Sequence, residues 1–414
     1  MAERRVAEPT VDDLRTAEAV VREGLAPTPL VAAPALGPGV LLKVETVQPT
    51  GSFKVRGALA AVADARPGEH VVTVSAGNHG LGVAQAAALL GRSATVVVPE
   101  NASRAKIDRL RSFPVDLVLA GDGYDAAEEH ALDLAVGGGV FVSPYNDPRV
   151  IAGQRTVAVE IGGSLDGPLT IAVPVGGGGL VAGVALWAAG HDDVRVVGVE
   201  AAASRAMSTA VRARRVVDVP IGATLADGMA GNVEAGSVTV AIAARHVDAW
   251  VAVEEDELRA AMRLLAFDSG LVAEGAGAAA TAAVVAGPLV DDAARRADRR
   301  TRDGPQHHAG GTARGARRLG GLTARGSRPR VRRRVPGRGR SVPPPRAACV
   351  LSRPAWPTTV SSSSAASTRR GPAATFRTSS RWSIRRSSRG RCTASCSRAR
   401  SSAGRTGSGT GTAR

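Results

Sequence analysis

Cysteine is missing from residues 1–290, and no long hydrophobic run occurs in the 414-residue sequence. The three cysteines, Cys349, Cys392 and Cys396, all lie near the C-terminus, which excludes a disulfide-stapled secreted fold for the first 290 residues. No stretch reaches the roughly 20 uninterrupted apolar residues that a membrane span needs. Residues 1–9 are charged and no apolar run follows them, so we expect a cytoplasmic protein that does not contact a membrane.

Acidic residues are missing from most of the C-terminal part. Residues 1–290 contain 33 acidic and 23 basic residues, a net charge of −10. Residues 291–414 contain 30 arginines, no lysine and 4 aspartates, a net charge of +26, and no acidic residue follows Asp303. The formal charge of +16 for the whole chain therefore describes neither part.

Residues 1–290 alternate between short β-branched segments and helical patterns. We expect strands at residues 71–74, 94–98, 115–119, 169–175, 194–199 and 249–253, and helices at residues 81–90, 103–111, 124–135, 150–161, 180–189, 255–267 and 274–286. This alternation implies right-handed crossovers, and so an α/β fold of mostly parallel sheets with helices on both faces. Ligands bind such folds where the carboxyl ends of strands turn into helices.

Four consecutive glycines, Gly176, Gly177, Gly178 and Gly179, connect the strand ending at residue 175 to the helix starting near Leu180. Glycine lets backbone N–H groups converge on an anion, and the helix N-terminus adds a favourable dipole. The turn lacks the Lys-Ser/Thr of a nucleotide P-loop and the spaced glycines of a dinucleotide site. It predicts a site for one phosphate; the alternative is an ordinary strand-to-helix turn.

Lysine is scarce, because arginine supplies nearly all of the positive charge. Lys43, Lys54 and Lys106 are the only lysines, and Lys54 lies in the segment 52–57 directly after a Pro-Thr-Gly turn. Arginine can replace lysine as a solvated charge but cannot form a Schiff base, because its guanidinium stays protonated. Lys54 is therefore a candidate for an imine with an aldehyde cofactor that carries a phosphate. The alternative is a surface lysine at a helix start.

A third turn, residues 75–80, also connects a predicted strand to a predicted helix. Ser75, Asn78 and His79 place a hydroxyl, an amide and an imidazole beside helix-terminal N–H groups, an arrangement that suits a carboxylate. Judged alone, the segment is equally an Asn/Gly turn with a capping serine.

In this order and spacing, residues 52–57, 75–80 and 176–180 resemble the pyridoxal-phosphate enzymes of fold type II, specifically their threonine/serine dehydratase branch. The resemblance continues through residues 146–154, 226–229 and 274–278, and it extends over about residues 10–288. It implies two open, twisted, mostly parallel sheets with helices on both faces.

The resemblance also implies a division into domains. Residues 1–69 and 148–290 would form a large domain that binds the cofactor, and residues 70–147 would form a small domain. The site would lie in the cleft.

For the cofactor, the resemblance implies that Lys54 holds pyridoxal 5′-phosphate as a Schiff base. Asn78 would bond the 3′ oxygen of the ring, Phe53 would lie beside the ring, and Gly228 would face it from the other side. The remaining cofactor contacts would be Gly176, Gly177, Gly178, Gly179, Leu180 and Glu274. The substrate carboxylate would be bound by Ser75, Ala76, Gly77, Asn78 and His79.

The implied reaction is β-elimination of water from L-threonine or L-serine, which gives 2-oxobutanoate or pyruvate plus ammonia. Lys54 would serve as both tether and base. The alternatives are a serine racemase, a hydroxyaspartate dehydratase, or a catalytically dead relative that binds the cofactor and carries a nucleic-acid-binding tail. The sequence does not choose between threonine, serine and hydroxyaspartate.

Racemisation needs a second acid/base, and the related racemases have a serine at the position matched by Ala76, which cannot transfer a proton. Dehydration is therefore favoured. The divalent-cation site of those racemases is also incomplete, because Glu200 is present but residues 201–207 contain no carboxylate. Hard cations need several oxygen ligands, so we expect no metal site.

The resemblance ends near residue 288. Family members continue with a central strand and a Ser/Thr-Gly-rich turn, and we find no such strand in residues 291–414, which are rich in Arg, Ser, Gly and Pro and lack hydrophobic periodicity. We therefore expect a disordered basic tail, a destabilised body and weak or no activity. A frameshift near residues 287–300 of a GC-rich gene is the favoured hypothesis.

The tail has two other interpretations, a genuine basic tail that binds nucleic acid through its arginines, or an unknown domain. Partners expected for the chain are a small amino-acid substrate and further copies of itself, as a dimer or tetramer.

Overall fold

The computed structural model describes residues 6–287 and 346–351, all within one compact unit, Met1–Thr358. The strands are β1 (Leu30–Ala32), β2 (Val40–Val44), β3 (His70–Val74), β4 (Ala94–Val98), β5 (Asp116–Leu119), β6 (Gly139–Phe141), β7 (Leu169–Pro174), β8 (Val194–Ala201), β9 (Ala249–Val253) and β10 (Arg346–Leu351).

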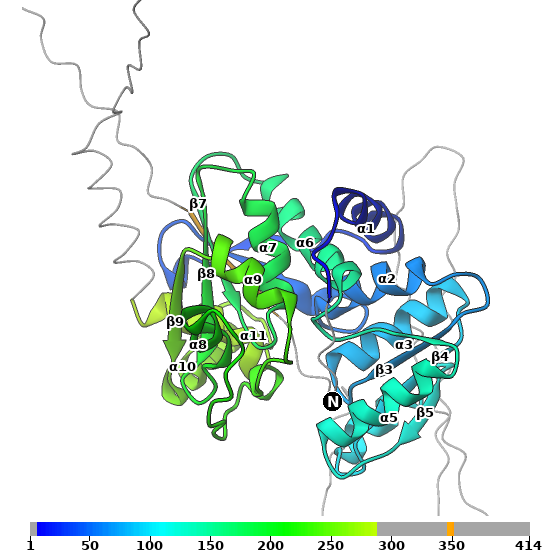
Figure 1. The fold of residues 1–414 in the computed structure, drawn as a ribbon. Coiled ribbons are helices and arrows are strands. Elements are labelled where there is room, and N and C mark those ends of the chain that lie inside the picture. Colours follow the sequence, from blue (N-terminus) through cyan, green and yellow to red (C-terminus); the bar gives the residue numbers. More distant parts are fainter. Residues whose placement is uncertain (1–5, 288–345, 352–414) are drawn as a thin grey trace, which may run out of the picture. The chain divides into compact units, whose positions relative to one another are not determined.

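Helices connect nearly all of these strands (Figure 1). The α-helices are α1 (Val11–Gly24), α2 (Lys54–Asp64), α3 (Asn78–Leu90), α4 (Arg104–Leu110), α5 (Tyr124–Val136), α6 (Pro148–Gly162), α7 (Gly179–Ala188), α8 (Ala206–Ala213), α9 (Val238–His246), α10 (Glu255–Asp268) and α11 (Gly275–Val285). Short 3₁₀ helices are η1 (Pro34–Leu36), η2 (Glu45–Val47) and η3 (Asp227–Met229).

The strands form two sheets. The six-stranded sheet has the order β1-β2-β10-β7-β8-β9, and only its β1–β2 pair is antiparallel. The four-stranded sheet has the order β5-β4-β3-β6 and is parallel throughout. The expected α/β fold with mostly parallel sheets is confirmed.

Both faces of the six-stranded sheet are covered, as the alternation of buried side chains along β7 shows. Ile171 and Val173 pack into a cluster with side chains of α6 and α7, whereas Ala172 packs into a second cluster with side chains of α10 and α11. Successive side chains of a strand point to opposite faces, so each face has its own helices.

Helix ends follow local chemistry. The α1 helix starts with a capping box, in which the Thr10 side chain accepts from the N–H of Asp13 while the Asp13 carboxylate accepts from the N–H of Thr10. The α6 helix starts at Pro148 behind Asp147, whose carboxylate accepts from two N–H groups of the first turn.

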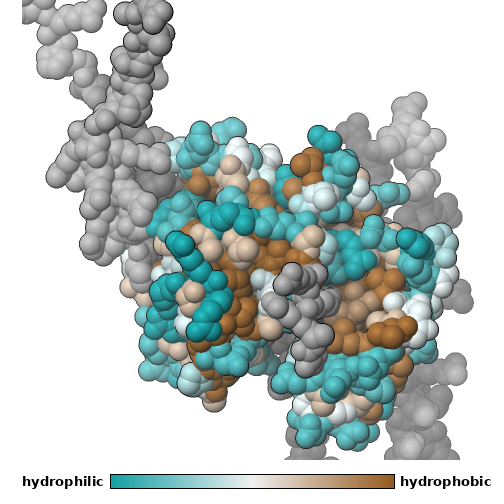
Figure 2. Space-filling model, viewed as in Figure 1, coloured by the Kyte–Doolittle hydropathy of each residue, from teal (hydrophilic) through white to brown (hydrophobic). Residues whose placement is uncertain are grey.

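Helix α5 shows the amphipathic pattern of a covering helix. It buries Ala127 and Ala131, one turn apart, and exposes Asp125, Glu129 and Asp133. Its outer face is hydrophilic in Figure 2. No helix among the described residues is long and apolar enough to cross a membrane.

One expectation about the C-terminal part is wrong. We expected no strand after residue 290, yet β10 pairs in parallel with both β2 and β7 and lies inside the six-stranded sheet. The strand is the short apolar run at residues 347–351, within an arginine-rich segment, and Ala348 and Cys349 are fully buried. The surrounding composition hid a run of ordinary strand length. The rest of the predicted tail lies outside the described residues.

Candidate active site

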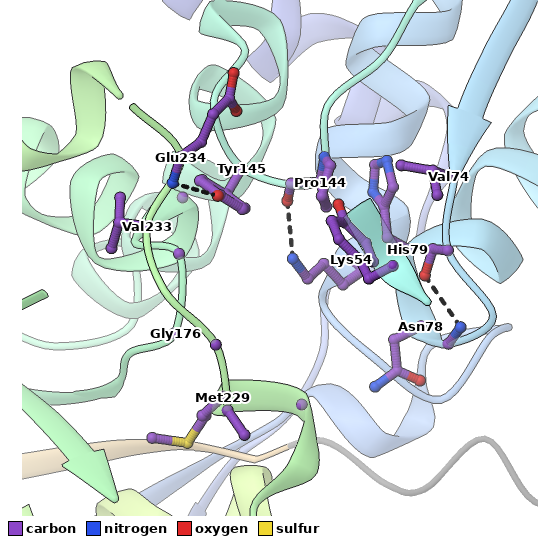
Figure 3. Close-up of a pocket in the computed structure, with 18 of the residues that line it drawn as sticks. Lys54, Val74, Asn78, His79, Pro144, Tyr145, Gly176, Met229, Val233 and Glu234 are labelled. Carbon is purple, nitrogen blue, oxygen red and sulfur yellow. Dashed lines mark hydrogen bonds between the residues drawn. The ribbon is translucent and has the colours of Figure 1, made fainter. Parts of the chain in front are cut away.

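Every site residue predicted from the sequence lines one cavity of about 950 Å³. The cavity is formed by the turns after β3, β6 and β7, the start of α2, and the segment around η3. Figure 3 shows Lys54, Asn78 and His79 on one side of it and Gly176, Met229 and Val233 on the other. Three of these residues, Asn78, His79 and Gly176, lie where β3 or β7 turns into a helix, as expected for an α/β fold.

Lys54 is the first residue of α2 and extends into the cavity (Figure 3). Its Nζ donates to the Pro144 carbonyl at 2.8 Å and lies 5.6 Å from the centroid of the Phe53 ring. Burial lowers the pKa of Lys54 to about 8, against the opposing effect of the Glu274 charge. An amine with this pKa is partly unprotonated near neutral pH and can act as a nucleophile.

The turn after β3 brings unpaired polar groups to the cavity. Helix α3 begins at Asn78 without a side-chain cap, so the N–H groups of its first turn are available to a ligand. The Asn78 Nδ2 donates to Glu274 Oε1 at 2.9 Å, while its buried Oδ1 has no hydrogen-bond partner among the described residues. Ser75 Oγ accepts from the N–H of Gly77 at 3.0 Å and shapes the turn.

The His79 ring is buried, with only 2% of its surface exposed. Its Nε2 lies 3.2 Å from the Val142 carbonyl, which can only accept, so Nε2 carries the proton. Burial, aided by the nearby charge of Lys54, lowers the pKa of His79 to about 3. The ring is therefore neutral, and His79 has only its backbone N–H to offer to an anion.

The glycine turn after β7 is shaped by close contacts. A Cβ at Gly177 would lie 2.3 Å from the Tyr145 ring, and one at Gly178, whose φ is +89°, would lie 2.4 Å from Met207 Cε. Only glycine fits both positions. No hydrogen bond among the described residues uses the N–H groups of Gly176, Gly177 or Gly178, so these donors are available at the start of α7.

Gly228, in η3, has no close contacts among the described residues of the kind found at Gly177 and Gly178. A Cβ there would meet only the Ala276 Cβ, at an ordinary 3.5 Å, so protein packing does not require glycine at this position. The missing side chain instead leaves open space in the cavity wall.

Carboxylates dominate the charged lining of the cavity. Lys54 and Lys106 are its lysines, Lys106 Nζ lies 3.3 Å from Asp227, and no arginine lines it among the described residues. The acidic lining residues are Asp125, Glu128, Asp218, Asp227, Glu234 and Glu274.

Comparison with known proteins assigns the chain to a family. The profile of the family described as pyridoxal-phosphate dependent enzyme matches residues 21–297. The chain belongs to this family. An L-threonine ammonia-lyase from Thermotoga maritima is 39% identical over 285 residues, 67% of this chain and 71% of that protein.

Solved structures of the family share the fold. Threonine deaminase isoform 2 from Solanum lycopersicum is 30% identical, with a TM-score of 0.62, and the match covers 69% of this chain and 87% of that one. Serine racemase from Dictyostelium discoideum is 26% identical, with a TM-score of 0.62, over 67% of this chain and 92% of that one.

The cavity suits the family's cofactor chemically. The N–H groups of the glycine turn, which bond to nothing within residues 6–287 and 346–351, suit a phosphate, and the amine of Lys54 suits an aldehyde. The buried, unpartnered Oδ1 of Asn78 suits a hydroxyl donor. The space beside Gly228 suits a flat ring.

Among the lining residues that the sequence did not predict are Pro144 and Tyr145, which precede the segment 146–154 that carried part of the resemblance. The Pro144 carbonyl accepts from Lys54, and the Tyr145 hydroxyl accepts from the N–H of Glu234 at 2.9 Å. An aromatic residue in a predicted loop was the available signal.

Glu200 lies at the end of β8 and acts as a helix cap. Its Oε1 accepts from the N–H groups of Met207 and Ser208, at 2.9 and 3.1 Å. In the part of the chain that the structure describes, no group of three or more His, Cys, Asp or Glu residues could hold a metal ion.

Proposed function

We propose that this pyridoxal-phosphate dependent enzyme is a lyase that removes water from L-threonine, L-serine or both, giving 2-oxobutanoate or pyruvate plus ammonia. One observation carries the proposal: a lysine amine with a pKa of about 8 lines the same cavity as the N–H groups of a glycine turn that bond to none of the described residues. The similarity to an L-threonine ammonia-lyase supports the choice of reaction.

Lys54 would hold the cofactor covalently, and Gly176, Gly177, Gly178, Gly179 and Leu180 would hold its phosphate. Phe53, Asn78, Gly228 and Glu274 would surround the ring. When bound, pyridoxal phosphate supplies an electron sink that stabilises negative charge at the substrate α-carbon.

The substrate carboxylate would be held at the start of α3. Backbone N–H groups of Asn78 and His79 and the Ser75 hydroxyl are the donors, with Ala76 and Gly77 forming the wall of the turn. The His79 ring takes no part in this contact because its only N–H points to Val142.

Freed from the cofactor when the substrate amine takes its place, Lys54 Nζ would accept the proton of the substrate α-carbon and pass a proton to the β-hydroxyl, which would leave as water. Hydrolysis of the resulting enamine releases the oxo acid and ammonia. Ala76 cannot return a proton from the opposite side, which favours elimination over racemisation.

The charges of the cavity favour a substrate with an uncharged side chain. A hydroxyaspartate would bring a second carboxylate into a lining with several carboxylates and no arginine among the described residues. The one lysine besides Lys54 already lies 3.3 Å from Asp227. We expect turnover of L-threonine or L-serine to exceed that of 3-hydroxyaspartate when kcat/KM is compared.

The first experiment adds pyridoxal phosphate to the purified full-length protein and records visible absorbance, followed by oxo-acid release from L-threonine. We expect a band and product from the wild-type protein and neither from Lys54→Ala. Lys106→Ala, which changes the other lining lysine, should keep the band. A wild-type protein without a band would contradict the proposal.

We also propose the domains, residues 1–69 with 148–290 and residues 70–147, because apart from β10 each sheet takes its strands from one of these two parts. We propose a cytoplasmic homo-oligomer, a dimer or tetramer. Sedimentation velocity measures the oligomer directly.

A nucleic-acid-binding tail is a second candidate function. The observation that favours it is the net charge of +26 over residues 291–414. Trp356, Phe376 and Trp382 are the only aromatic residues there, which argues against a base-stacking platform.

A further inference from the structure

The glycine turn is hydrogen-bonded from behind by a buried threonine. Thr239, the second residue of α9, is fully buried, and its Oγ1 donates to the Gly177 carbonyl at 2.9 Å. The sequence patterns did not single out Thr239, and Thr239 does not line the cavity.

The hydrogen bond fixes the direction of one peptide group. A trans peptide is planar, and its C=O and N–H point in opposite directions. Because the Gly177 carbonyl points to Thr239, the N–H of Gly178 points to the opposite side of the turn. Gly178 itself lines the cavity.

A peptide between two glycines has little intrinsic preference for one orientation, because glycine tolerates both signs of φ. If the peptide between Gly177 and Gly178 turned over, its carbonyl oxygen would replace an N–H donor in the turn. That oxygen would repel an anion. A fixed orientation of the Gly177–Gly178 peptide therefore favours anion binding, and the glycines themselves do not fix that orientation.

A second hydroxyl supports the threonine. Ser237 Oγ lies 2.8 Å from Thr239 Oγ1, and since the Thr239 hydroxyl donates to Gly177, the Ser237 hydroxyl is the donor to Thr239. Ser237 stands at the N-cap of α9 but makes no capping hydrogen bond. The N–H of Val238 is instead bonded by Asn146 Oδ1 at 3.1 Å.

We propose that Thr239, supported by Ser237, is a positioning residue that orients the Gly177–Gly178 peptide so that its N–H faces the phosphate of the cofactor. The inference rests on the proposed function, because it takes the glycine turn as the phosphate site. Thr239 contacts neither cofactor nor substrate and acts only through the turn.

The test compares two aldehydes, pyridoxal phosphate and pyridoxal, which differ by the phosphate alone. Both are titrated against the full-length protein by visible absorbance. We expect Thr239→Val, which keeps the shape but lacks the hydroxyl, to weaken pyridoxal phosphate binding about tenfold and to change pyridoxal binding less than about twofold. Thr239→Ser should bind both as the wild-type protein does.

Two results would overturn the inference. Thr239→Val with the wild-type preference for pyridoxal phosphate shows that the hydroxyl is not needed, while the proposed function stands. A wild-type protein that attaches neither compound contradicts the proposed function and the inference with it.

If Thr239→Val does not fold, the comparison of Thr239→Ser with Thr239→Ala tests the inference. Both lack the methyl group and they differ only in the hydroxyl, so tighter pyridoxal phosphate binding by the serine variant supports the inference. Equal binding overturns it.

Discussion

At the scale of single residues, each lysine of the sequence has a defined environment. Lys43 is buried beside Glu45 and Glu160, Lys54 extends into the cavity, and Lys106 pairs with Asp227. Lys43 and Lys54 make specific contacts that an arginine would not reproduce, whereas Lys106 is a partly exposed ion pair that an arginine could also form.

The environment of Lys54 predicts a pH dependence. Its burial lowers its pKa to about 8, and only the unprotonated amine attaches to an aldehyde. The rate at which apo protein attaches pyridoxal phosphate should therefore rise with pH and level off above about 8, rather than near the ordinary lysine value of 10.5. Stopped-flow absorbance between about pH 6 and about pH 10 measures this, because the range extends about two units to either side of the lowered pKa of Lys54. A rise that continues beyond pH 9 would show that burial does not lower the pKa.

Alanine substitutions at two glycines of the cavity should differ in their effect on the free energy of unfolding. Gly228→Ala adds a Cβ with one ordinary contact, so the free energy of unfolding should change by less than about 0.5 kcal/mol while pyridoxal phosphate binding weakens. Gly178→Ala places alanine at φ +89° against Met207, which should cost about 1–3 kcal/mol. Urea unfolding of the apo proteins and absorbance titration separate the two effects. Equal stability losses would contradict this distinction.

The sequence predicted the cavity well where residues occur in continuous segments, such as Gly176 to Leu180 and Ser75 to His79. It could not predict the His79 ring, whose bond to Val142 joins residues 63 positions apart. Thr239 was hidden for the same reason, because its partner Gly177 is 62 residues away.

At the scale of elements, the sequence predicted most of the longer strands and helices, but it missed the 14-residue α1 and the 11-residue α2 as well as short or interrupted strands. β6 has three residues, and β2 contains the buried Lys43, which breaks its apolar pattern. Lys43 can be buried there because Glu160 and Glu45 balance its charge.

β10 predicts a sharp effect of one substitution. Cys349 is fully buried in the centre of the six-stranded sheet, and burial raises the pKa of its thiol to about 12. Cys349→Asp would bury an unpaired carboxylate and should cost about 3 kcal/mol or more, whereas Cys349→Ala should cost about 1 kcal/mol. Urea unfolding of both variants tests the strand itself. If the two variants are equally stable, residue 349 is not in the sheet.

Lys43, Glu45, Arg56 and Glu160 form a largely buried ion cluster. This cluster predicts a loss of stability when one of its carboxylates is removed. Arg56, two residues after Lys54 in α2 and fully buried, bonds Glu45 and Glu160. Burial opposes the charge of Glu160, but the hydrogen bonds and charges of Arg56 and Lys43 dominate and lower its pKa. A lowered folded-state pKa means that the carboxylate contributes stability above its unfolded pKa and loses it as pH falls through the folded value.

Glu160→Gln should therefore cost about 2–4 kcal/mol at pH 7 and progressively less in acid. Glu8→Gln, in the exposed pair with Arg245, should cost less than about 1 kcal/mol. Urea unfolding between pH 7 and about pH 3 measures both variants. A cost for Glu160→Gln that does not shrink in acid would show that packing, not charge, sets it.

At the scale of the whole molecule, the two parts of the chain carry opposite net charge, −10 for residues 1–290 and +26 for residues 291–414. We expected the chain to lack the central strand of its larger sheet. This expectation is wrong, because β10 lies in the basic part and completes that sheet. The frameshift hypothesis stays a prediction. Sequencing the gene across residues 287–345 tests it, and a confirmed frame with no neighbouring frame that encodes a Val-rich strand would end it.

The basic part predicts salt-dependent binding. Residues 291–414 alone should retain duplex DNA on a filter at low salt and lose it steeply as salt rises, because arginines displace counterions from phosphates. Retention that does not change with salt would point to a different kind of contact.

The position of β10 in the sequence also determines when the six-stranded sheet can form during synthesis. Its strand partners, β2 and β7, have left the ribosome long before residues 346–351 are made, and α11 ends at Val285. At about 5–20 residues per second, the nascent chain spends several seconds with its main sheet divided and two strand edges open. Slower translation lengthens that interval, so the yield of folded protein should depend on how quickly the message between α11 and β10 is read.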